Sequence, residues 1–239
     1  MNSPKRLARI AGVLYLLVGI FGGFAQGYLY PKIYVAGDAG KTAANVIANS
    51  GLVRAGVVSD LFQATVWVFL AIALYQLLKH VNKEVAGAMV VLAAMGATIT
   101  MLNSLFEFEA LRIATGAVRL ATLGAAGSTA MVQLLVDAQH NGLLIASIFM
   151  GLWLAPLGYL AYRSGMFPRS LGVVLVAACA AYLVDFVAAF LVPDFGKSIH
   201  GYLIILPTIA EPSMLLYLLI TGVRTVKTSN TQRPILAAA

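Results

Sequence analysis

Six apolar runs, each about as long as a lipid bilayer is thick, constrain this chain more than any other feature of its sequence. A hydrocarbon core about 30 Å thick requires roughly 20 apolar residues in helical form. Lipid offers the backbone no hydrogen-bonding partner, so we expect each run to be a helix. The runs are residues 9–30, 53–79, 85–110, 141–163, 170–192 and 202–223. The sequence therefore predicts an all-α polytopic membrane bundle of about six transmembrane helices. We expect a single transmembrane domain over residues 1–239, in which residues 224–239 form a short cytoplasmic tail.

The composition excludes several other classes of protein. Charged residues make up 10% of the chain and hydrophobic residues 61%, with a mean hydropathy of +0.90. A soluble domain has about 25% charged residues, so the solvent of this protein is a lipid bilayer. The net charge of +7 is scattered over short connections, which does not indicate nucleic-acid binding. Cys179 is the only cysteine, which excludes an intrachain disulfide and a paired-cysteine metal site.

The distribution of Lys and Arg predicts the orientation of the bundle. Of 16 such residues, ten lie in the two terminal segments and the second and fourth connections, and six lie on the other side. Segments richer in Lys and Arg stay in the cytoplasm. We therefore predict that both termini are cytoplasmic.

Two long connections are predicted on the outer side. Residues 31–52 are typical of a turn followed by a short helix capped near Asp38 or Thr42. Residues 112–127 are apolar with two arginines, a pattern of a segment that lies flat at the membrane interface.

The fourth span is predicted to extend beyond its apolar run. A helix can start at Ser128 and continue into the span, with bends near Gly142 and Pro156. In the sixth span, Pro207 and Pro212 free backbone carbonyls and predict a kink.

Ionisable residues within the spans gather in the predicted outer half of the membrane. The ones of most interest are Asp60, Asp137, His140, Asp185 and Glu211. A charge at the bilayer centre costs at least about 2.5–3.5 kcal/mol, so such residues normally face the bundle interior or a watery cavity. Positions three, four and seven apart share one helix face. By this spacing, five of the spans each carry one stripe of mostly polar residues. The stripes are Asp60, Gln63 and Trp67; Thr100, Asn103 and Glu107; Asp137, His140, Asn141 and Ser147; Ala178, Tyr182 and Asp185; and His200, Ile204, Pro207 and Glu211. We predict that these stripes meet in one outward-opening cavity that binds a ligand.

Simpler interpretations stay open for several of these residues. Asp137 and His140 can act as helix-end groups at the headgroup level. Glu107, Glu109 and Arg112 can form an interfacial ion pair, and a kink beside Glu211 can be architectural. Tyrosines and tryptophans in the spans are typical of packing or of interface anchors.

Four segments resemble a known family. They are RLARIAGVLYLLVGIFGG from residue 6, VRAGVVSDLFQATVWVFLAIALYQLLKHVNKE from residue 53, DAQHNGLLIASIFMGLWLAPLGYLAYRSGMFPRSLGVVLVAACAAYLVD from residue 137, and EPSMLLYLLITGV from residue 211. Their order and spacing are similar to the bacterial membrane proteins grouped as domain of unknown function 4386. The residues that match this layout are Asp60, His140, Arg163, Gly165, Pro168, Asp185 and Glu211. The resemblance implies a multi-span protein of the bacterial inner (plasma) membrane, and it implies no activity.

Three functions are compatible with the residues. The first is binding or transport of a small molecule or lipid through the cavity. The second is a metal-dependent hydrolase acting on lipid, for which His140, His200 and Asp60 are weak candidate ligands. The third is an accessory subunit of a larger membrane complex, docked through small residues such as Gly87, Gly96, Gly151 and Gly172. The sequence identifies no cofactor, so whether the protein is an enzyme stays open.

Overall fold

Six long apolar helical segments dominate the computed structural model, which describes residues 3–118 and 123–224. They are Pro4–Ile33, Ser50–Leu78, Lys83–Ala114, Gly124–Ser164, Arg169–Leu191 and Pro193–Ile220. The described residues contain no strand. The predicted all-α class with six membrane spans is therefore confirmed. The fourth and sixth segments begin earlier than their apolar runs, at Gly124 and Pro193.

Three of the six segments consist of successive helices. The first contains α1 (Pro4–Gly22), a π-helix (Gly23–Leu29) and α2 (Tyr30–Ile33). The fourth contains α6 (Gly124–Leu152) and α7 (Leu154–Ser164), and the sixth contains α9 (Pro193–Leu203) and α10 (Ile205–Ile220). The other segments are α4 (Ser50–Leu78), α5 (Lys83–Ala114) and α8 (Arg169–Leu191), and a short helix α3 (Ala39–Ala48) precedes α4.

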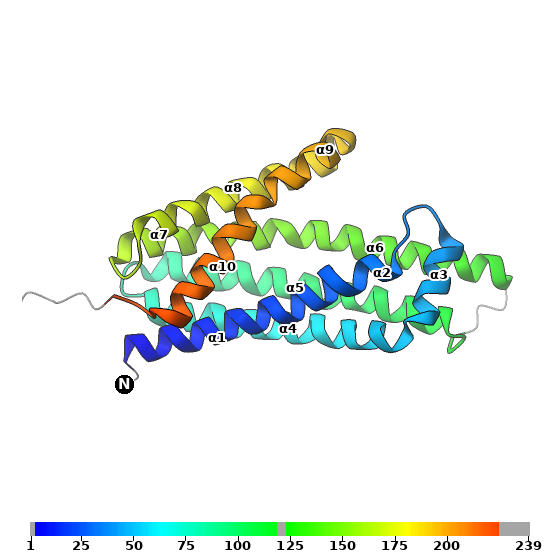
Figure 1. The fold of residues 1–239 in the computed structure, drawn as a ribbon, viewed down its shortest axis with the longest axis horizontal. Coiled ribbons are helices and arrows are strands. Elements are labelled where there is room, and N and C mark those ends of the chain that lie inside the picture. Colours follow the sequence, from blue (N-terminus) through cyan, green and yellow to red (C-terminus); the bar gives the residue numbers. More distant parts are fainter. Residues whose placement is uncertain (1–2, 119–122, 225–239) are drawn as a thin grey trace, which may run out of the picture.

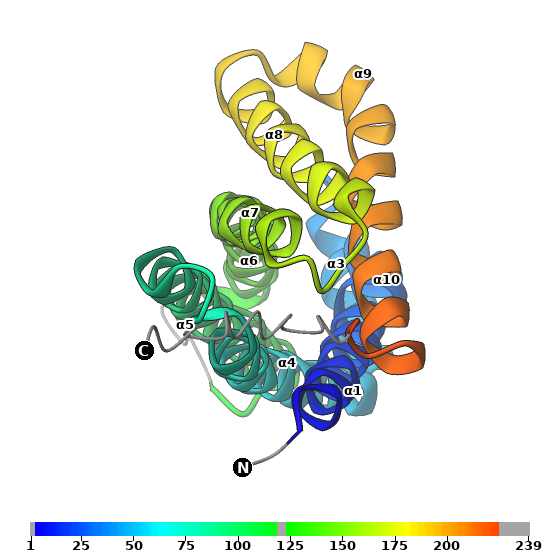
Figure 2. The same ribbon diagram turned by 90° about the vertical axis from the view of Figure 1, so that its left-hand side faces the viewer.

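The six segments are arranged as a closed ring (Figures 1 and 2). Neighbours around the ring are α1, α4, α5, the α6–α7 pair, α8 and α10, and α10 returns to α1. Figure 1 shows α1 beginning and α10 ending at the same end of the bundle, whereas α3 lies at the other end. At the α3 end, α8, α9 and the start of α10 diverge from the other helices. The assignment of the α1 start to the cytoplasm rests on the positive-inside rule.

Local sequence signals set several helix ends. The Ser3 side chain accepts a hydrogen bond from the Arg6 amide at 3.3 Å, and Asn82 accepts one from the Val85 amide at 3.0 Å. Such side chains satisfy amides that have no partner within the helix. Gly165 ends α7 with φ of 66°, in the left-handed region that favours glycine.

The short helix α3 confirms one predicted cap and corrects the other. Asp38 is the capping residue, and its carboxylate accepts a hydrogen bond from the Lys41 amide at 2.9 Å. This bond to the Lys41 amide lowers the pKa of Asp38. Thr42 lies inside α3, and its hydroxyl bonds instead to the amide and carbonyl of Val35, each at 3.1 Å.

The segment predicted to lie flat at the interface, residues 112–127, begins in one helix and ends in another. Arg112 occupies the last turn of α5, and α6 begins at Gly124 rather than at Ser128. Arg119, the second arginine of this segment, lies outside the described residues. Residues 112–114 and 124–127 of this segment therefore belong to the ends of α5 and α6, which extend beyond their most hydrophobic cores.

Helix breaks lie three residues before two prolines. α6 continues through Gly142 and ends at Leu152, so Trp153 separates it from α7 ahead of Pro156. Ile204 likewise separates α9 from α10 ahead of Pro207. A proline has no N–H to bond the carbonyl four residues earlier, so the helix is interrupted there. The helix is unbroken at Gly142, where the lack of a side chain allows close packing against Asn103.

The largest buried cluster of the ring is apolar, and so is the outside of the ring. Trp153, Leu154 and Leu157 are fully buried in one large cluster that joins most of the spans. Large apolar side chains such as Phe62, Leu102 and Val173 are exposed on the perimeter. An apolar perimeter of this extent fits lipid as the surrounding solvent.

Candidate functional site

A cavity of about 320 Å³ lies where α1 and α10 diverge. α1, the π-helix, α4, α6, α8 and α10 all contribute to its wall. Three of its lining residues, Gly19, Gly23 and Pro212, are exposed. A Cβ atom at Gly19 or Gly23 would meet nothing within 4 Å. The cavity therefore opens on the side of the ring between α1, the π-helix and α10.

Glu211 is the charged side chain of this cavity, and two tyrosines hold its carboxylate. The Tyr15 hydroxyl donates to Oε2 at 2.8 Å, and the Tyr182 hydroxyl donates to Oε1 at 3.2 Å. These bonds connect α1, α8 and α10 at one point. No Lys, Arg or His is among the described residues that line the cavity.

Aromatic rings form another part of the wall. Trp153 lies edge-to-face against Tyr15, with ring centroids 5.7 Å apart, and against Trp67 at 5.6 Å. Gly96 of α5 leaves room for Trp67, since a Cβ there would lie 2.5 Å from the indole ring. The three rings are mutually fixed by packing, which gives the cavity a rigid apolar side.

Two glutamines line the cavity on the side nearer α3. A Cβ on Gly22 would lie 2.8 Å from Nε2 of Gln63, so this glycine allows the amide to pack against α1. The Gln63 Oε1 atom is buried and has no hydrogen-bonding partner. Gln26 of the π-helix donates through Nε2 to both oxygens of Asp60, at 3.0 and 3.2 Å.

Asp60 therefore lies behind Gln26 and does not itself line this cavity. Its side chain is 1% exposed, and the neighbouring Glu107, with which it interacts electrostatically, is 5% exposed. Gly56 lies beside Glu107 and leaves room for the Leu29 side chain, which a Cβ at this position would overlap. Of the three residues predicted to form an interfacial ion pair, Glu109 and Arg112 do so at 2.6 Å, whereas Glu107 is buried beside Asp60.

Asp137 and His140 belong to a separate group near α3. The His140 ring stacks on Tyr30 and Tyr34, with centroids 5.5 and 5.7 Å apart. Asp137 accepts a hydrogen bond from Gln133 at 2.9 Å. Burial, followed by the carboxyl of Asp137, raises the pKa of Tyr34. Neither Asp137 nor His140 lines the cavity of Glu211.

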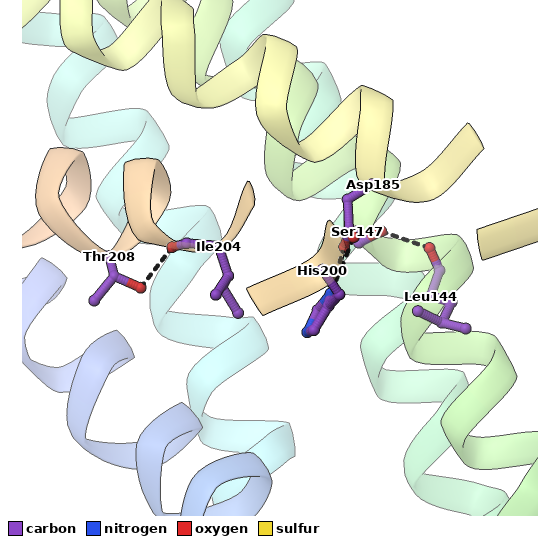
Figure 3. Close-up of polar contacts among 6 residues, drawn as sticks. All are labelled: Leu144, Ser147, Asp185, His200, Ile204 and Thr208. Atoms are coloured by element: carbon purple, nitrogen blue, oxygen red, sulfur yellow. Dashed lines mark hydrogen bonds and ion pairs between the residues drawn. The ribbon is translucent and has the colours of Figure 1, made fainter. Parts of the chain in front are cut away.

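Asp185 and His200 form a third group at the diverging end of the ring. Figure 3 shows the His200 ring directed at the Asp185 carboxylate, with Nδ1 2.9 and 3.0 Å from the two oxygens. The pair connects α8 to α9. In the same view, the Ser147 hydroxyl donates to the Leu144 carbonyl at 2.6 Å, and Thr208 bonds to Ile204 at 2.8 Å. Both hydroxyls therefore donate to backbone carbonyls of their own helical segments and do not contact the Asp185–His200 pair.

The described residues do not assemble a metal centre. No three His, Cys, Asp or Glu side chains among them are placed to hold one ion. His140, His200 and Asp60 thus belong to three different groups. The described residues therefore provide no set of ligands for the metal ion that the hydrolase hypothesis requires.

The glycines considered for docking to a larger complex mostly serve contacts within the chain. A Cβ at Gly151 would lie 2.6 Å from Tyr182, and one at Gly172 would lie 2.6 Å from the Gly158 carbonyl. Gly96 accommodates Trp67, as described above. Gly87 alone of the four meets nothing within 4 Å.

Comparison with known proteins places the chain in a family. The family model described as Domain of unknown function (DUF4386) matches residues 10–222. The chain belongs to this family. No curated protein and no solved structure matches it. The match confirms the resemblance stated above, and the family's description assigns no activity. Function must therefore be argued from the site that this DUF4386 protein forms.

Sequence reasoning missed two residues of the site. The sequence indicates only packing or an interface anchor for Tyr15, because a tyrosine in an apolar run carries no sign of its partner. Gln26 was not selected, although a glutamine in the middle of a span is a signal that could have found it. Both lie on the first span, and their partners Glu211 and Asp60 are 196 and 34 residues away.

Proposed function

We propose that this DUF4386 protein binds a small molecule or lipid in the cavity around Glu211, as a carrier or receptor of the bacterial inner membrane. The observation that carries the proposal is a carboxylate presented to a cavity inside the bilayer. A buried acid is costly in lipid, and one placed within a transmembrane bundle is by default a candidate functional group. The size of the cavity lies within the range of sites for small organic ligands, about 300–1,000 Å³.

The side opening supports uptake of the ligand from the bilayer. The mouth lies between α1, the π-helix and α10, and its exposed glycines carry no side chain that could close it. The ring neighbours α1 and α10 are in contact near Gly12, where a Cβ would lie 2.9 Å from the Leu219 amide. Away from that contact they diverge toward α3 (Figure 1). A molecule dissolved in the outer half of the membrane would reach Glu211 through this wedge.

Irregular helices around the cavity support a carrier in particular. Membrane transporters place their sites near the midplane, beside discontinuous helices. Here the π-helix supplies Gln26, the break at Trp153 supplies an aromatic wall, and Pro212 follows Glu211. π-Helical turns are often found at functional sites. Each irregularity gives the wall a position at which the helix can bend.

A ligand screen by thermal unfolding tests the proposal. The purified protein in mild detergent would be heated with a library of small amphiphiles, beside Gly19→Leu and the matched control Gly87→Leu. Leucine at Gly19 fills the mouth, whereas Gly87 lies on α5 away from the cavity. At about 100 times its dissociation constant, a ligand adds about 2.7 kcal/mol to the free energy of unfolding. We expect hits that stabilise the wild type and the Gly87→Leu variant but not Gly19→Leu.

Two results would contradict the proposal. One is a screen in which no compound stabilises the wild type. The other is a set of hits that stabilise Gly19→Leu equally well, since such ligands would bind elsewhere. Size-exclusion chromatography of each variant would show that it is folded before the comparison is made.

A further inference from the structure

The charge of the cavity restricts the chemistry of its ligand. Glu211 is the charged residue of the lining, and the described lining has no basic residue. In a low-dielectric setting an unpaired carboxylate is strongly destabilised, and a ligand that supplies the missing positive charge removes this cost. An anionic ligand, such as a carboxylate or a phosphate headgroup, would add a second negative charge at short range. Electrostatics therefore favours a cation.

The hydrogen bonds of the wall lead to the same ligand. Each tyrosine hydroxyl has one hydrogen to donate, and Tyr15 and Tyr182 both donate to Glu211. The Nε2 group of Gln26 donates to Asp60. A carboxylate can accept about four hydrogen bonds, so Glu211 retains acceptor capacity. The Oε1 atom of Gln63 has no partner but is buried, and a half-turn of the amide, which exchanges it with Nε2, brings it to the cavity. The wall thus offers hydrogen-bond acceptors, and a ligand that matches it must carry hydrogen-bond donors.

The remaining walls favour an apolar body on that ligand. Trp67, Trp153 and Tyr15 form a fixed aromatic group beside the acceptors. Aromatic rings attract cations through their quadrupole and also pack well against apolar groups. The volume of the cavity, about 320 Å³, is that of a site for a small organic molecule, about 300–1,000 Å³.

We infer that the ligand of this cavity is an organic ammonium ion with an apolar or aromatic body. Its N–H groups donate to the Glu211 carboxylate and, once the Gln63 amide has made its half-turn, to Oε1 of Gln63, and its body lies against Trp67 and Trp153. This inference rests on the proposed binding function and adds the chemical class of the ligand. It also assigns Tyr15 and Tyr182 the role of positioning residues, which orient the carboxylate toward the cavity.

Three matched probes test the inference by isothermal titration calorimetry at pH 7 in detergent. They are 1-naphthylmethylamine, 1-naphthalenemethanol and 1-naphthoate, which share a ring system and have a cationic, a neutral and an anionic head. We expect the amine to bind about 10- to 100-fold more tightly than the alcohol, because hydrogen bonds to charged groups are the strong ones. The naphthoate should bind most weakly of the three.

Variants of the cavity residues then test which side chains are responsible for the preference for the amine. Glu211→Gln should weaken amine binding by about 10- to 100-fold while changing alcohol binding less than about threefold. Gln63→Met removes the second acceptor and should weaken amine binding several-fold, which tests the assignment even if Glu211→Gln does not fold. The control Glu109→Gln removes an acid that pairs with Arg112 outside the cavity, and amine binding should be unchanged.

The possible outcomes separate this inference from the proposed function. If amine and alcohol bind equally and Gly19→Leu abolishes both, the cavity binds ligands but does not select cations, so the inference is wrong and the function stands. If Glu211→Gln leaves amine binding intact, the inference is also wrong. If none of the three probes binds, cation selection is overturned, and the wider screen described above decides whether the cavity binds anything.

Discussion

The two ends of the ring are packed with different kinds of side chain. At the end that contains the chain's N-terminus, buried residues such as Leu74, Leu157 and Leu160 are apolar. Toward α3, the same helices bury polar groups: Ser59, Asp60, Thr100, Asn103, Ser104, Glu107 and Gln139. These seven residues come from the α3-side portions of α4, α5 and α6. The cavity of Glu211 lies at the boundary between the two ends.

This difference shows how each end is held together. Lipid tails are as apolar as leucine, so the apolar end gains little from the hydrophobic effect and depends on close packing of small residues. Gly158 and Gly172 bring α7 and α8 into backbone contact there. The polar end depends on hydrogen bonds and on exact pairing of side chains across helices. One end is therefore rigid and closed, while the other retains groups that can bind or exchange partners.

The largest expected effect comes from adding volume at the apolar end. In Gly172→Leu, the new Cβ would lie 2.6 Å from the Gly158 carbonyl and 2.8 Å from the Tyr162 amide. Backbone atoms cannot move aside cheaply, so we expect a loss of at least about 3 kcal/mol, at the upper end for overpacking. Thermal unfolding in detergent, followed by tryptophan fluorescence, measures it. Gly87→Leu, in open space on α5, should change stability by less than about 0.5 kcal/mol. Equal stability of the two variants would show that the α7–α8 contact does not close this end.

At the polar end, added volume should be less costly and should be rescued by a side chain. A Cβ on Gly142 of α6 would overlap the Asn103 amide of α5, so Gly142→Ala should cost about 2 kcal/mol. Truncation of the partner in Gly142→Ala/Asn103→Ala removes the clash, and the double variant should recover more than half of the loss. A double-mutant cycle on unfolding free energies gives the coupling. Simple additivity would mean that these two residues do not pack against each other, and the comparison between the ends would fail.

Much of the contrast between the apolar end and the polar end of the ring could be predicted from the sequence. The concentration of ionisable residues on one side of the membrane followed from the span boundaries alone, and the burial of Asp60 followed from its depth. The helix face shared by Thr100, Asn103 and Glu107 was also predicted, and all three are buried. These features depend on helix periodicity and length, which are local.

The grouping of the polar residues could not be predicted in this way. The residue spacing predicts that five stripes share one cavity, whereas the structure places Asp137 with His140 near α3 and Asp185 with His200 at the diverging end. Which stripes meet depends on the order of helices around the ring, and periodicity carries no information on that order. The contact between Tyr15 and Glu211 closes the ring between its first and last spans, so nothing local to either residue indicates it.

A smaller effect tests whether the Glu211 group belongs to the polar end. Tyr15→Phe and Tyr182→Phe each remove one hydrogen bond to the carboxylate, and each should cost about 1 kcal/mol of unfolding free energy. Tyr15→Phe should be the more harmful, since its bond of 2.8 Å is shorter than the 3.2 Å bond of Tyr182. Tyr159→Phe, on an exposed ring, is the matched control. If the unfolding free energies of both variants equal that of the control, the tyrosines do not hold Glu211. The Glu211 group would then not belong to the polar end of the ring.

The smallest expected effect concerns Asp38, at the solvent-exposed edge of the polar end. Its pKa is lowered because the carboxylate accepts a hydrogen bond from the Lys41 amide. A group whose pKa is lowered by folding stabilises the protein above its ordinary pKa, about 4, and loses that contribution as pH falls through the folded value. Thermal unfolding of the wild type and Asp38→Asn should therefore converge between pH 6 and pH 3, because asparagine retains the cap but has no charge to lose. A difference between the two proteins that stays constant over this range would show that α3 is held by its packing on α5 and α6 and not by the ionised cap.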